Sequence, residues 1–367
     1  MPNPNSIPRR YAARPAPPAP ANPLRTKYLG LDLDSPLVVG ACPLCDDIDA
    51  VRLLEEYGAS AIVMHSLFEE QITGEQLASI YMMESVADSY SEARSYFPRA
   101  DEYGLGPSQY LEQIQRIKRA VKIPCIASLN GTTVGGWTNY ARMIEQAGAD
   151  AIELNVYHIP TDPTETGAEV EMNLLEIVRY VRNAVKIPVA VKLSPFFSSI
   201  ANLAGKLEQA GANGVVLFNR FYQPDVNIVD QTALPNLQLS EPGETLLLRL
   251  RWLAIISNRF NLSLACSGGV HSAEDVIKAV MCGAHAVQLV SVLLKNGPAE
   301  LKFIRTELAK ALKALDYRSI EQIQGSMSLI HCPDPRAFER ANYMRILQSW
   351  KPDLVWTANP ALQKSPR

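Results

Sequence analysis

The sequence predicts an α/β protein, a (β/α)8 TIM barrel with long insertions at the C-terminal ends of its strands. Eight near-continuous apolar runs have the length of strands, and such runs are typical of a parallel sheet buried on both faces. Between them lie stretches with apolar residues three and four positions apart, as in amphipathic helices. The predicted strands are Pro36–Ala41, Ala61–Ser66, Pro124–Ser128, Ala151–Val156, Pro188–Leu193, Gly214–Asn219, Leu262–Ser267 and Ala286–Ser291.

Four similar Gly-Ala turns lead from a predicted helix into a predicted strand. They are Tyr57–Ser60, Ala147–Asp150, Ala210–Asn213 and Cys282–His285. Glycine ends such helices in a left-handed conformation that other residues resist. The same helix–turn–strand unit therefore recurs along the chain. This recurrence favours a closed barrel over the alternative, a doubly wound open sheet.

The two ends of the chain differ in composition from the rest. Residues 1–26 contain eight prolines and four arginines but no acidic residue, which predicts a disordered or polyproline-like arm. An organelle-targeting peptide is the alternative, but such peptides form amphipathic helices, which this proline density forbids. We expect this arm at 1–26, one barrel domain at 27–350 and a loose tail at 351–367.

The overall composition narrows the class of protein. The formal net charge is −3, 47% of the residues are hydrophobic, and no apolar stretch has the length of a membrane span. Because no basic stripe is interleaved with aromatic residues, we expect neither nucleic acid nor membrane as a partner. Six cysteines without a regular framework indicate a reducing compartment, so a cytoplasmic location is expected.

Two connections are longer than ordinary β/α loops. They run from Leu67 to about Pro107 and from Arg220 to about Gly243, and both leave the C-terminal end of a strand. Loops of this length are usually lids or binding loops, and this end of a barrel carries the chemistry. Within the second connection, Val226–Val229 and Leu237–Leu239 have the lengths expected for a small hairpin.

Polar residues appear where the apolar strands stop, and Lys192 is the most informative of them. An ammonium group buried without a partner costs several kcal/mol. Lys192, near the end of Pro188–Leu193, therefore needs a carboxylate or an anionic ligand. A structural ion pair is the alternative to a ligand role.

The ends of the last two strands predict a phosphate site. Gly268 and Gly269 follow the seventh strand, and Val290 and Ser291 end the eighth. Glycines let backbone amides approach an anion, and these two loops form the common phosphate site of such barrels. A helix beginning near Ser272, with Asp275 completing a capping box, points its positive end to the same place.

These strand ends, with an opening segment Tyr28–Leu37, resemble the dihydroorotate dehydrogenase family from about Lys27 to Tyr317. The resemblance implies a barrel that binds FMN, with a short hairpin before the first strand and Lys192 beside the flavin ring. It places the following residues at the cofactor: Ala41, Cys42, Ser66, Asn130, Asn155, Lys192, Gly268, Gly269, Val290 and Ser291. It places Asn155 and Asn219 at the substrate.

The loop after the fourth strand departs from the family pattern. Family members resemble Asn-x-Ser-Cys-Pro-Asn there, whereas this chain has Asn155-Val156-Tyr157-His158-Ile159-Pro160. His158 replaces the cysteine that is the base in some members, so Tyr157 and His158 are candidates for proton transfer. His65 replaces a family lysine and is a further candidate. Polar residues bonded to nearby groups are the alternative interpretation for both histidines.

Cys42 and Cys45 have the spacing of redox and metal sites. No second cysteine pair and no nearby histidine completes a zinc set, so we predict no metal site. Two buried cysteines without a function are the simpler interpretation. At the end of the first strand, however, a dithiol beside a flavin could exchange electrons.

We conclude from the sequence that the protein is an FMN-dependent oxidoreductase of CH–CH donors, of the dihydroorotate dehydrogenase type. A hydride would pass from a small substrate, dihydroorotate by default in pyrimidine biosynthesis, to flavin N5. Two alternatives stay open: a barrel that binds FMN or a phosphate ligand without turnover, and a flavin-free lyase in which Lys192 forms a Schiff base. The electron acceptor is unassigned, and a homodimer is compatible with the apolar helices.

Overall fold

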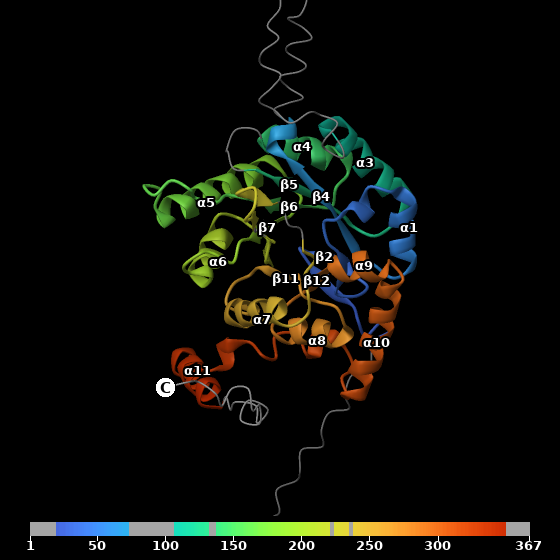
Figure 1. Ribbon diagram of the computed structural model, residues 1–367. Helices are drawn as coiled ribbons and strands as arrows, with labels where there is room; N and C mark the ends of the chain where they lie inside the picture. Colours follow the sequence, from blue (N-terminus) through green and yellow to red (C-terminus); the bar gives the residue numbers. More distant parts are fainter. Residues whose placement is uncertain (1–19, 73–105, 132–136, 221–223, 235–237, 350–367) are drawn as a thin grey trace, which may run out of the picture.

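Eight parallel strands close into a barrel, in the order β11-β12-β3-β4-β5-β6-β7-β8 (Figure 1). The computed structural model describes residues 20–72, 106–131, 137–220, 224–234 and 238–349. The barrel strands are β3 (Leu37–Val39), β4 (Ala61–Phe68), β5 (Cys125–Asn130), β6 (Ala151–Asn155), β7 (Val189–Leu193), β8 (Gly214–Leu217), β11 (Ser263–Ser267) and β12 (Ala286–Leu289). All eight predicted strands and the closed barrel are confirmed, and the open-sheet alternative is excluded because β8 pairs with β11.

Helices surround the strands, as the amphipathic stretches predict (Figure 1). The helices that follow barrel strands are α1 (Ile48–Glu56), α3 (Pro107–Ala120), α4 (Trp137–Ala147), α5 (Gly167–Ala184), α6 (Ile200–Gln209), α7 (Glu244–Ile256), α8 (Ala273–Met281) and α10 (Glu300–Ala314). Helix α5 illustrates the cause: Thr166 and Glu169 form a capping box at its start, and Ile177 and Val178 bury its inner face. Further helical segments are η1 (Pro43–Cys45), α9 (Ser291–Asn296), η4 (Ile320–Gln322), η5 (Leu329–His331) and α11 (Pro335–Ser349).

The four Gly-Ala turns have the predicted backbone. Their glycines have left-handed φ angles from +95° at Gly211 to +113° at Gly283. At Gly283 the requirement is also steric, because a Cβ atom would lie 2.1 Å from the Ser257 hydroxyl oxygen. These turns end each helix within a few residues of the next strand.

A two-stranded hairpin, β1 (Thr26–Tyr28) and β2 (Leu31–Leu33), closes the N-terminal end of the barrel. Tyr28, Leu29 and Leu33 are buried in one cluster with the inward residues of the lower barrel, such as Val63 and Val216. The hairpin implied by the family resemblance is therefore present. Since apolar side chains fill this end, the open end of the barrel lies at the carboxyl ends of the strands, here called the mouth.

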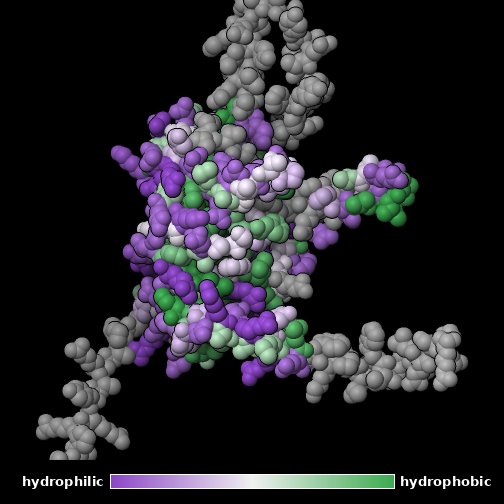
Figure 2. Space-filling model, turned by 90° about the vertical axis from the view of Figure 1, so that its left-hand side faces the viewer, coloured by the Kyte–Doolittle hydropathy of each residue, from purple (hydrophilic) through white to green (hydrophobic). Residues whose placement is uncertain are grey.

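The second long connection contains a hairpin of β9 (Asp225–Asn227) and β10 (Thr232–Leu234). The predicted hairpin is confirmed, but its second strand precedes the predicted Leu237–Leu239. The turn is tighter than expected because the Asn227 side chain accepts from Val229 N at 2.9 Å and donates to Asp230 at 2.7 Å. The space-filling view shows a projection tipped by hydrophobic residues, in keeping with exposed Ile228 and Val229 (Figure 2).

The remaining predictions about the chain ends lie partly outside the described residues. Residues 1–19 of the predicted arm, 73–105 of the first insertion and 350–367 at the C-terminus are not among them. Of the arm, residues 20–26 pack on the barrel, with Leu24 buried and Thr26 beginning β1. Among the described helices, none is both long and apolar enough to cross a bilayer.

Candidate active site

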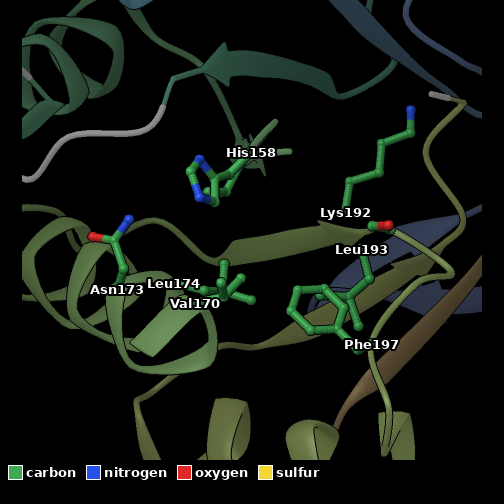
Figure 3. Close-up of a pocket in the computed structure, with 9 residues that line it drawn as sticks. His158, Val170, Asn173, Leu174, Lys192, Leu193 and Phe197 are labelled. Carbon is green, nitrogen blue, oxygen red and sulfur yellow. The ribbon is translucent and has the colours of Figure 1, made fainter. Parts of the chain in front are cut away.

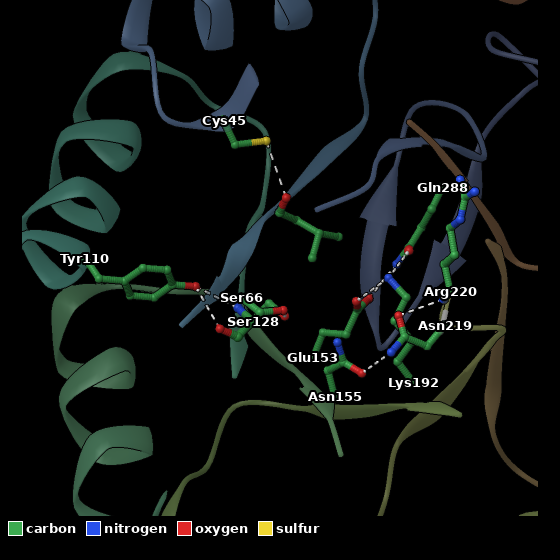
Figure 4. A network of polar contacts seen from close by, with 11 residues as sticks. Cys45, Ser66, Tyr110, Ser128, Glu153, Asn155, Lys192, Asn219, Arg220 and Gln288 are labelled. Carbon is green, nitrogen blue, oxygen red and sulfur yellow. Dashed lines mark hydrogen bonds and ion pairs between the residues drawn. The ribbon is translucent and has the colours of Figure 1, made fainter. Parts of the chain in front are cut away.

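A ladder of polar side chains lies inside the barrel, one layer above the apolar cluster (Figure 4). Glu153 and Asn155 come from β6, Lys192 from β7 and Gln288 from β12. Ala151 of the same strand belongs to the cluster inside the barrel. Residues two apart on a strand face the same side, so Glu153 and Asn155 also point inward. The register pairs Asn155 with Lys192, which places the end of β6 beside the lysine.

Lys192 forms an ion pair with Glu153 at the centre of this ladder. The Lys192 Nζ atom lies 3.1 Å from Glu153 Oε1 and 3.3 Å from Gln288 Oε1, and Gln288 Nε2 donates to the other Glu153 oxygen. The Glu153 side chain is 1% exposed and that of Lys192 is 10% exposed. A buried pair is stable only when further hydrogen bonds satisfy both partners, and Gln288 supplies them. The carboxylate that Lys192 requires is therefore Glu153.

The two predicted substrate asparagines lie in direct contact. Asn219 Nδ2 donates to Asn155 Oδ1 at 2.7 Å, and the backbone amide of Arg220 donates to Asn219 Oδ1 at 2.9 Å (Figure 4). This pairing fixes the orientation of both amides at the mouth. Asn130 is also buried at the mouth and is the register partner of Asn155.

A pocket opens between the ends of β6 and β7 and helix α5, which contributes Val170 and Leu174 to its lining. In Figure 3, Leu193 and Phe197 lie below His158, and the Lys192 ammonium points away from His158, in keeping with its bond to Glu153. The His158 Nε2 atom lies 2.9 and 3.0 Å from the two Glu165 carboxylate oxygens. A carboxylate that accepts from one ring nitrogen fixes the tautomer and leaves the other nitrogen, Nδ1, to accept a proton.

His65 has a different environment. Its Nδ1 atom contacts the Asp46 carboxylate, and its ring meets the Tyr110 ring edge-on at 5.5 Å. A shift of register in β4 between Val63 and Ser66 accompanies this placement, and Ser66 instead bonds Ser128 at 2.8 Å. Among the described residues, His65 is thus held by η1 and α3, and it is not part of the Lys192 network or the pocket lining.

Ser240, Gly268, Gly269 and Ser291 converge at the ends of β11 and β12, and we call them the serine–glycine cup. The amide of Gly269 donates to Ser240 Oγ at 3.2 Å, and Ser240 Oγ donates to Ser291 Oγ at 2.8 Å. Gly269 has φ +81°, and a Cβ there would lie 2.7 Å from Leu246 N. The cup therefore requires glycine, and its amide and hydroxyl groups meet at one point.

Arg249 of α7 lies against the cup and was not predicted from the sequence. It is 8% exposed, donates to Ser267 O and Thr245 O at 2.6 Å each, and a Cβ on Gly268 would lie 3.1 Å from its Nη2. Burial, and secondarily the nearby Arg220, lowers the pKa of Arg249. No ion pair in the described part of the chain involves either arginine. A buried guanidinium without a carboxylate fits an anionic ligand, and with the cup it fits a phosphate group.

The helix expected to face the phosphate begins at the predicted place, and its role there stays a prediction. Ser272 and Asp275 form the predicted capping box of α8. However, Asp275 Oδ2 accepts from the amides of both His271 and Ser272 at 3.0 Å. The carboxylate therefore occupies the two amides that immediately precede α8, and Arg249 brings a positive charge to the cup.

The remaining predicted residues line the mouth without forming a single cluster. Ala41 packs against the inner barrel cluster, and Val290 caps α9 and approaches Gly40. Cys42 is buried at the end of β3, and Tyr157 lies in the loop beside His158. Within the described ranges, no three His, Cys, Asp or Glu side chains meet where they could hold a metal ion.

The site residues that the sequence analysis did not identify are contact partners of those that it did. Glu153 and Gln288 are polar residues at inward positions of apolar strands, so alternation along the strand could have revealed them. Arg249 interrupts the apolar face of a helix, which is also a visible signal. Asp46 and Glu165 gave none, because their contacts with histidines depend on loop geometry.

The structure is that of a (β/α)8 barrel with a buried ion pair inside it and a serine–glycine cup at its mouth, where barrel enzymes carry their active sites. A sequence model of the dihydroorotate dehydrogenase family matches residues 24–312. The chain therefore belongs to the dihydroorotate dehydrogenase family. It is an oxidoreductase of the class that acts on CH–CH donors.

Individual relatives agree with this assignment. The chain is 27% identical over 307 residues to the catalytic subunit of dihydroorotate dehydrogenase B (NAD(+)) from Thermoplasma volcanium, covering 82% of this chain and 97% of that one. It is 30% identical over 210 residues to the catalytic subunit of the same name from Bacillus pumilus, covering 55% and 66%. It is 31% identical over 180 residues to dihydroorotate dehydrogenase A (fumarate) from Limosilactobacillus reuteri, covering 47% and 58%.

The substitution Glu153→Gln tests whether the ion pair stabilises the barrel. It leaves the Lys192 ammonium buried without a counter-charge, so we expect the free energy of unfolding to fall by about 3–5 kcal/mol. Urea denaturation measures this loss. Combining it with Lys192→Met should restore part of the stability, since the orphaned charge is then removed. The matched control is Glu274→Gln, which breaks an exposed i,i+4 pair with Lys278 and should cost less than about 1 kcal/mol. Equal losses in both variants would contradict the interpretation.

Proposed function

We propose that the protein is an FMN-dependent dehydrogenase that transfers a hydride from dihydroorotate to flavin N5. The observation that carries the proposal is the pairing, at one barrel mouth, of a buried lysine with a serine–glycine cup backed by Arg249. Family membership supports the choice of FMN and of dihydroorotate. The reaction belongs to pyrimidine biosynthesis.

The donors of the cup fit the phosphate of FMN. The Gly269 amide, the Ser240 and Ser291 hydroxyls and the Arg249 guanidinium would hold it, with Ser240 exchanging its present contacts for phosphate oxygens. Bound FMN supplies a two-electron acceptor that protein side chains lack. The Lys192 ammonium, fixed by Glu153, stabilises negative charge that develops at the mouth in a water-poor environment.

The polar side chains on the other side of the mouth act on the substrate. The Asn155 and Asn219 amides orient the carbonyl and N–H groups of a planar ring. His158, held at Nε2 by Glu165, accepts the substrate proton at Nδ1. His158 thus takes the role of the base that the altered loop lacks. His65, bound to Asp46, contributes to the shape of the mouth rather than to proton transfer.

The rival functions differ in what they require of Lys192. A Schiff-base lyase needs an amine that is free to attack a carbonyl group, whereas the Lys192 Nζ atom is engaged by Glu153 and Gln288. The lyase alternative is therefore disfavoured. A barrel that binds FMN without turnover has the same site and differs only in its reaction with substrate.

We propose a small-molecule electron acceptor of the kind named for the relatives, NAD+ or fumarate. The homodimer stays a prediction that sedimentation equilibrium can test.

The visible spectrum of the purified protein tests the proposed function directly. We expect flavin absorption bands, and their loss on anaerobic addition of dihydroorotate, because the substrate reduces the bound cofactor. Bands that persist would show FMN binding without this reaction. A colourless protein that takes up no added FMN would overturn the assignment.

The substitution Arg249→Met tests the phosphate site. Loss of a charge-assisted contact worth about 1.5–3 kcal/mol should weaken FMN binding about 10- to 150-fold, as measured by quenching of flavin fluorescence. Arg251→Met is the matched control, two residues further on α7 in an exposed pair with Glu339, and it should leave the affinity unchanged. The melting temperature of the cofactor-free proteins separates lost binding from lost folding. Equal affinities of the two variants would remove Arg249 from the site.

The substitution His158→Gln tests the proposed base. We expect kcat with dihydroorotate to fall by about 10²–10⁴-fold. At alkaline pH, the remaining rate should depend on pH in the same way as uncatalysed proton loss from the substrate. The FMN content should not change, because His158 contacts Glu165 and not the cup. His331→Gln, at an exposed position, is the control. A full rate in His158→Gln would assign the proton transfer to another group.

A further inference from the structure

Cys42 and Cys45 form a tight turn at the end of β3. Cys42 precedes η1 and Cys45 ends it, and the Cys45 amide donates to Cys42 O at 3.1 Å. A turn closed in this way holds the first and fourth Cα atoms within about 7 Å, close to the range that a disulfide spans. Cys42 is 4% exposed and Cys45 is fully buried, so the pair is sheltered at the mouth.

The surrounding side chains hold this turn in place. Gln113 Nε2 of α3 donates to Cys45 O at 3.2 Å and to Asp46 O at 2.8 Å. Asp46 is also bound by His65, and the Cys45 thiol donates to Val63 O at 3.4 Å. The backbone of the turn is therefore held by α3, and the Cys45 sulfur is held by β4.

The two thiols differ in acidity. The neighbouring Cys45 thiol is the main cause that lowers the pKa of Cys42, and the charge of Lys192 lowers it further. The neighbouring Cys42 thiol, with burial, raises the pKa of Cys45 well above its usual range. By contrast, burial raises the pKa of Cys125 and of Cys266 to about 12 each. A reactive first thiol and a protonated second one are the features of a redox-active Cys-x-x-Cys pair.

We propose that Cys42 and Cys45 are a redox-active dithiol that closes reversibly to a disulfide and exchanges two electrons with FMN at the same mouth. On oxidation, both thiols lose their protons, the Cys45 sulfur bonds the Cys42 sulfur, and two electrons pass to oxidised FMN. In the reverse direction, reduced FMN gives two electrons to the disulfide, and both sulfurs take up protons. The pair thus stores two electrons beside the site of substrate oxidation. The electron exchange rests on the proposed function, whereas disulfide formation does not.

The position of the pair supports this proposal, because Cys42 and Lys192 both lie at the carboxyl ends of barrel strands. The Lys192 charge also lowers the pKa of Cys42. All six cysteines of the chain are free thiols in this structure, so the Cys42–Cys45 pair is in its reduced form.

Thiol counting tests the dithiol without any need for bound flavin. The protein is equilibrated anaerobically in glutathione buffers of rising disulfide fraction, quenched in acid, alkylated and mapped by mass spectrometry. We expect the free thiols to fall from six to four, with the loss confined to the peptide that links Cys42 and Cys45. Cys45→Ser should form no intramolecular disulfide and lose at most the Cys42 thiol, as a mixed disulfide with glutathione that mass spectrometry identifies, while the control Cys332→Ser should still lose two thiols to the Cys42–Cys45 link. Six free thiols under the most oxidising buffer would overturn the proposal.

A second measurement tests the electron exchange. The protein with both thiols reduced is loaded with oxidised FMN under anaerobic conditions, without substrate. Partial bleaching of the flavin, matched by loss of the Cys42 and Cys45 thiols and absent in Cys45→Ser, supports the exchange. Two results together would overturn the exchange while the disulfide still forms with glutathione. Bound FMN would stay oxidised beside the dithiol, and FMN that has been reduced would not be reoxidised by the disulfide. Failure to bind FMN at all would sink the proposed function, and the glutathione titration would still decide the dithiol.

Discussion

The buried ion pair between Glu153 and Lys192 is the interaction on which the barrel mouth depends. Two charges inside a parallel barrel are stable only because each satisfies the other and Gln288 of a third strand completes their hydrogen bonds. The pair sets a boundary between the apolar cluster below and the polar mouth above. It also fixes the Lys192 ammonium, and the positions of the paired asparagines follow from the same register.

The mouth is divided by strand order into regions with different chemistry. The ends of β11 and β12 carry the serine–glycine cup, with Arg249 behind it, whereas the ends of β6 and β7 carry the pocket with His158. Neighbouring strands in a closed barrel present their ends to a common centre. The serine–glycine cup and the pocket with His158 therefore lie at the ends of different strands of the same barrel.

Predictions from the sequence were most accurate for features that depend on the conformational preference of a few neighbouring residues. The strands, the glycine turns and the α8 cap follow from local preferences, so each was found at its predicted place. The partners of the site residues were missed for the opposite reason. Glu165 and Asp46 are ordinary acidic residues in sequence, and only the path of their loops brings them to His158 and His65. The second hairpin strand was misplaced because side-chain bonds at Asn227 shortened the turn.

The sequence by itself determined the repeated helix–turn–strand unit, its eightfold count and the glycines at the cup, because periodicity and positive φ angles depend on neighbouring residues. Tertiary structure alone decided which groups face one another. It paired Lys192 with Glu153, directed His65 to Asp46 and brought Arg249 to the cup. These contacts join residues far apart in the sequence, and closing the barrel creates the geometry that selects them.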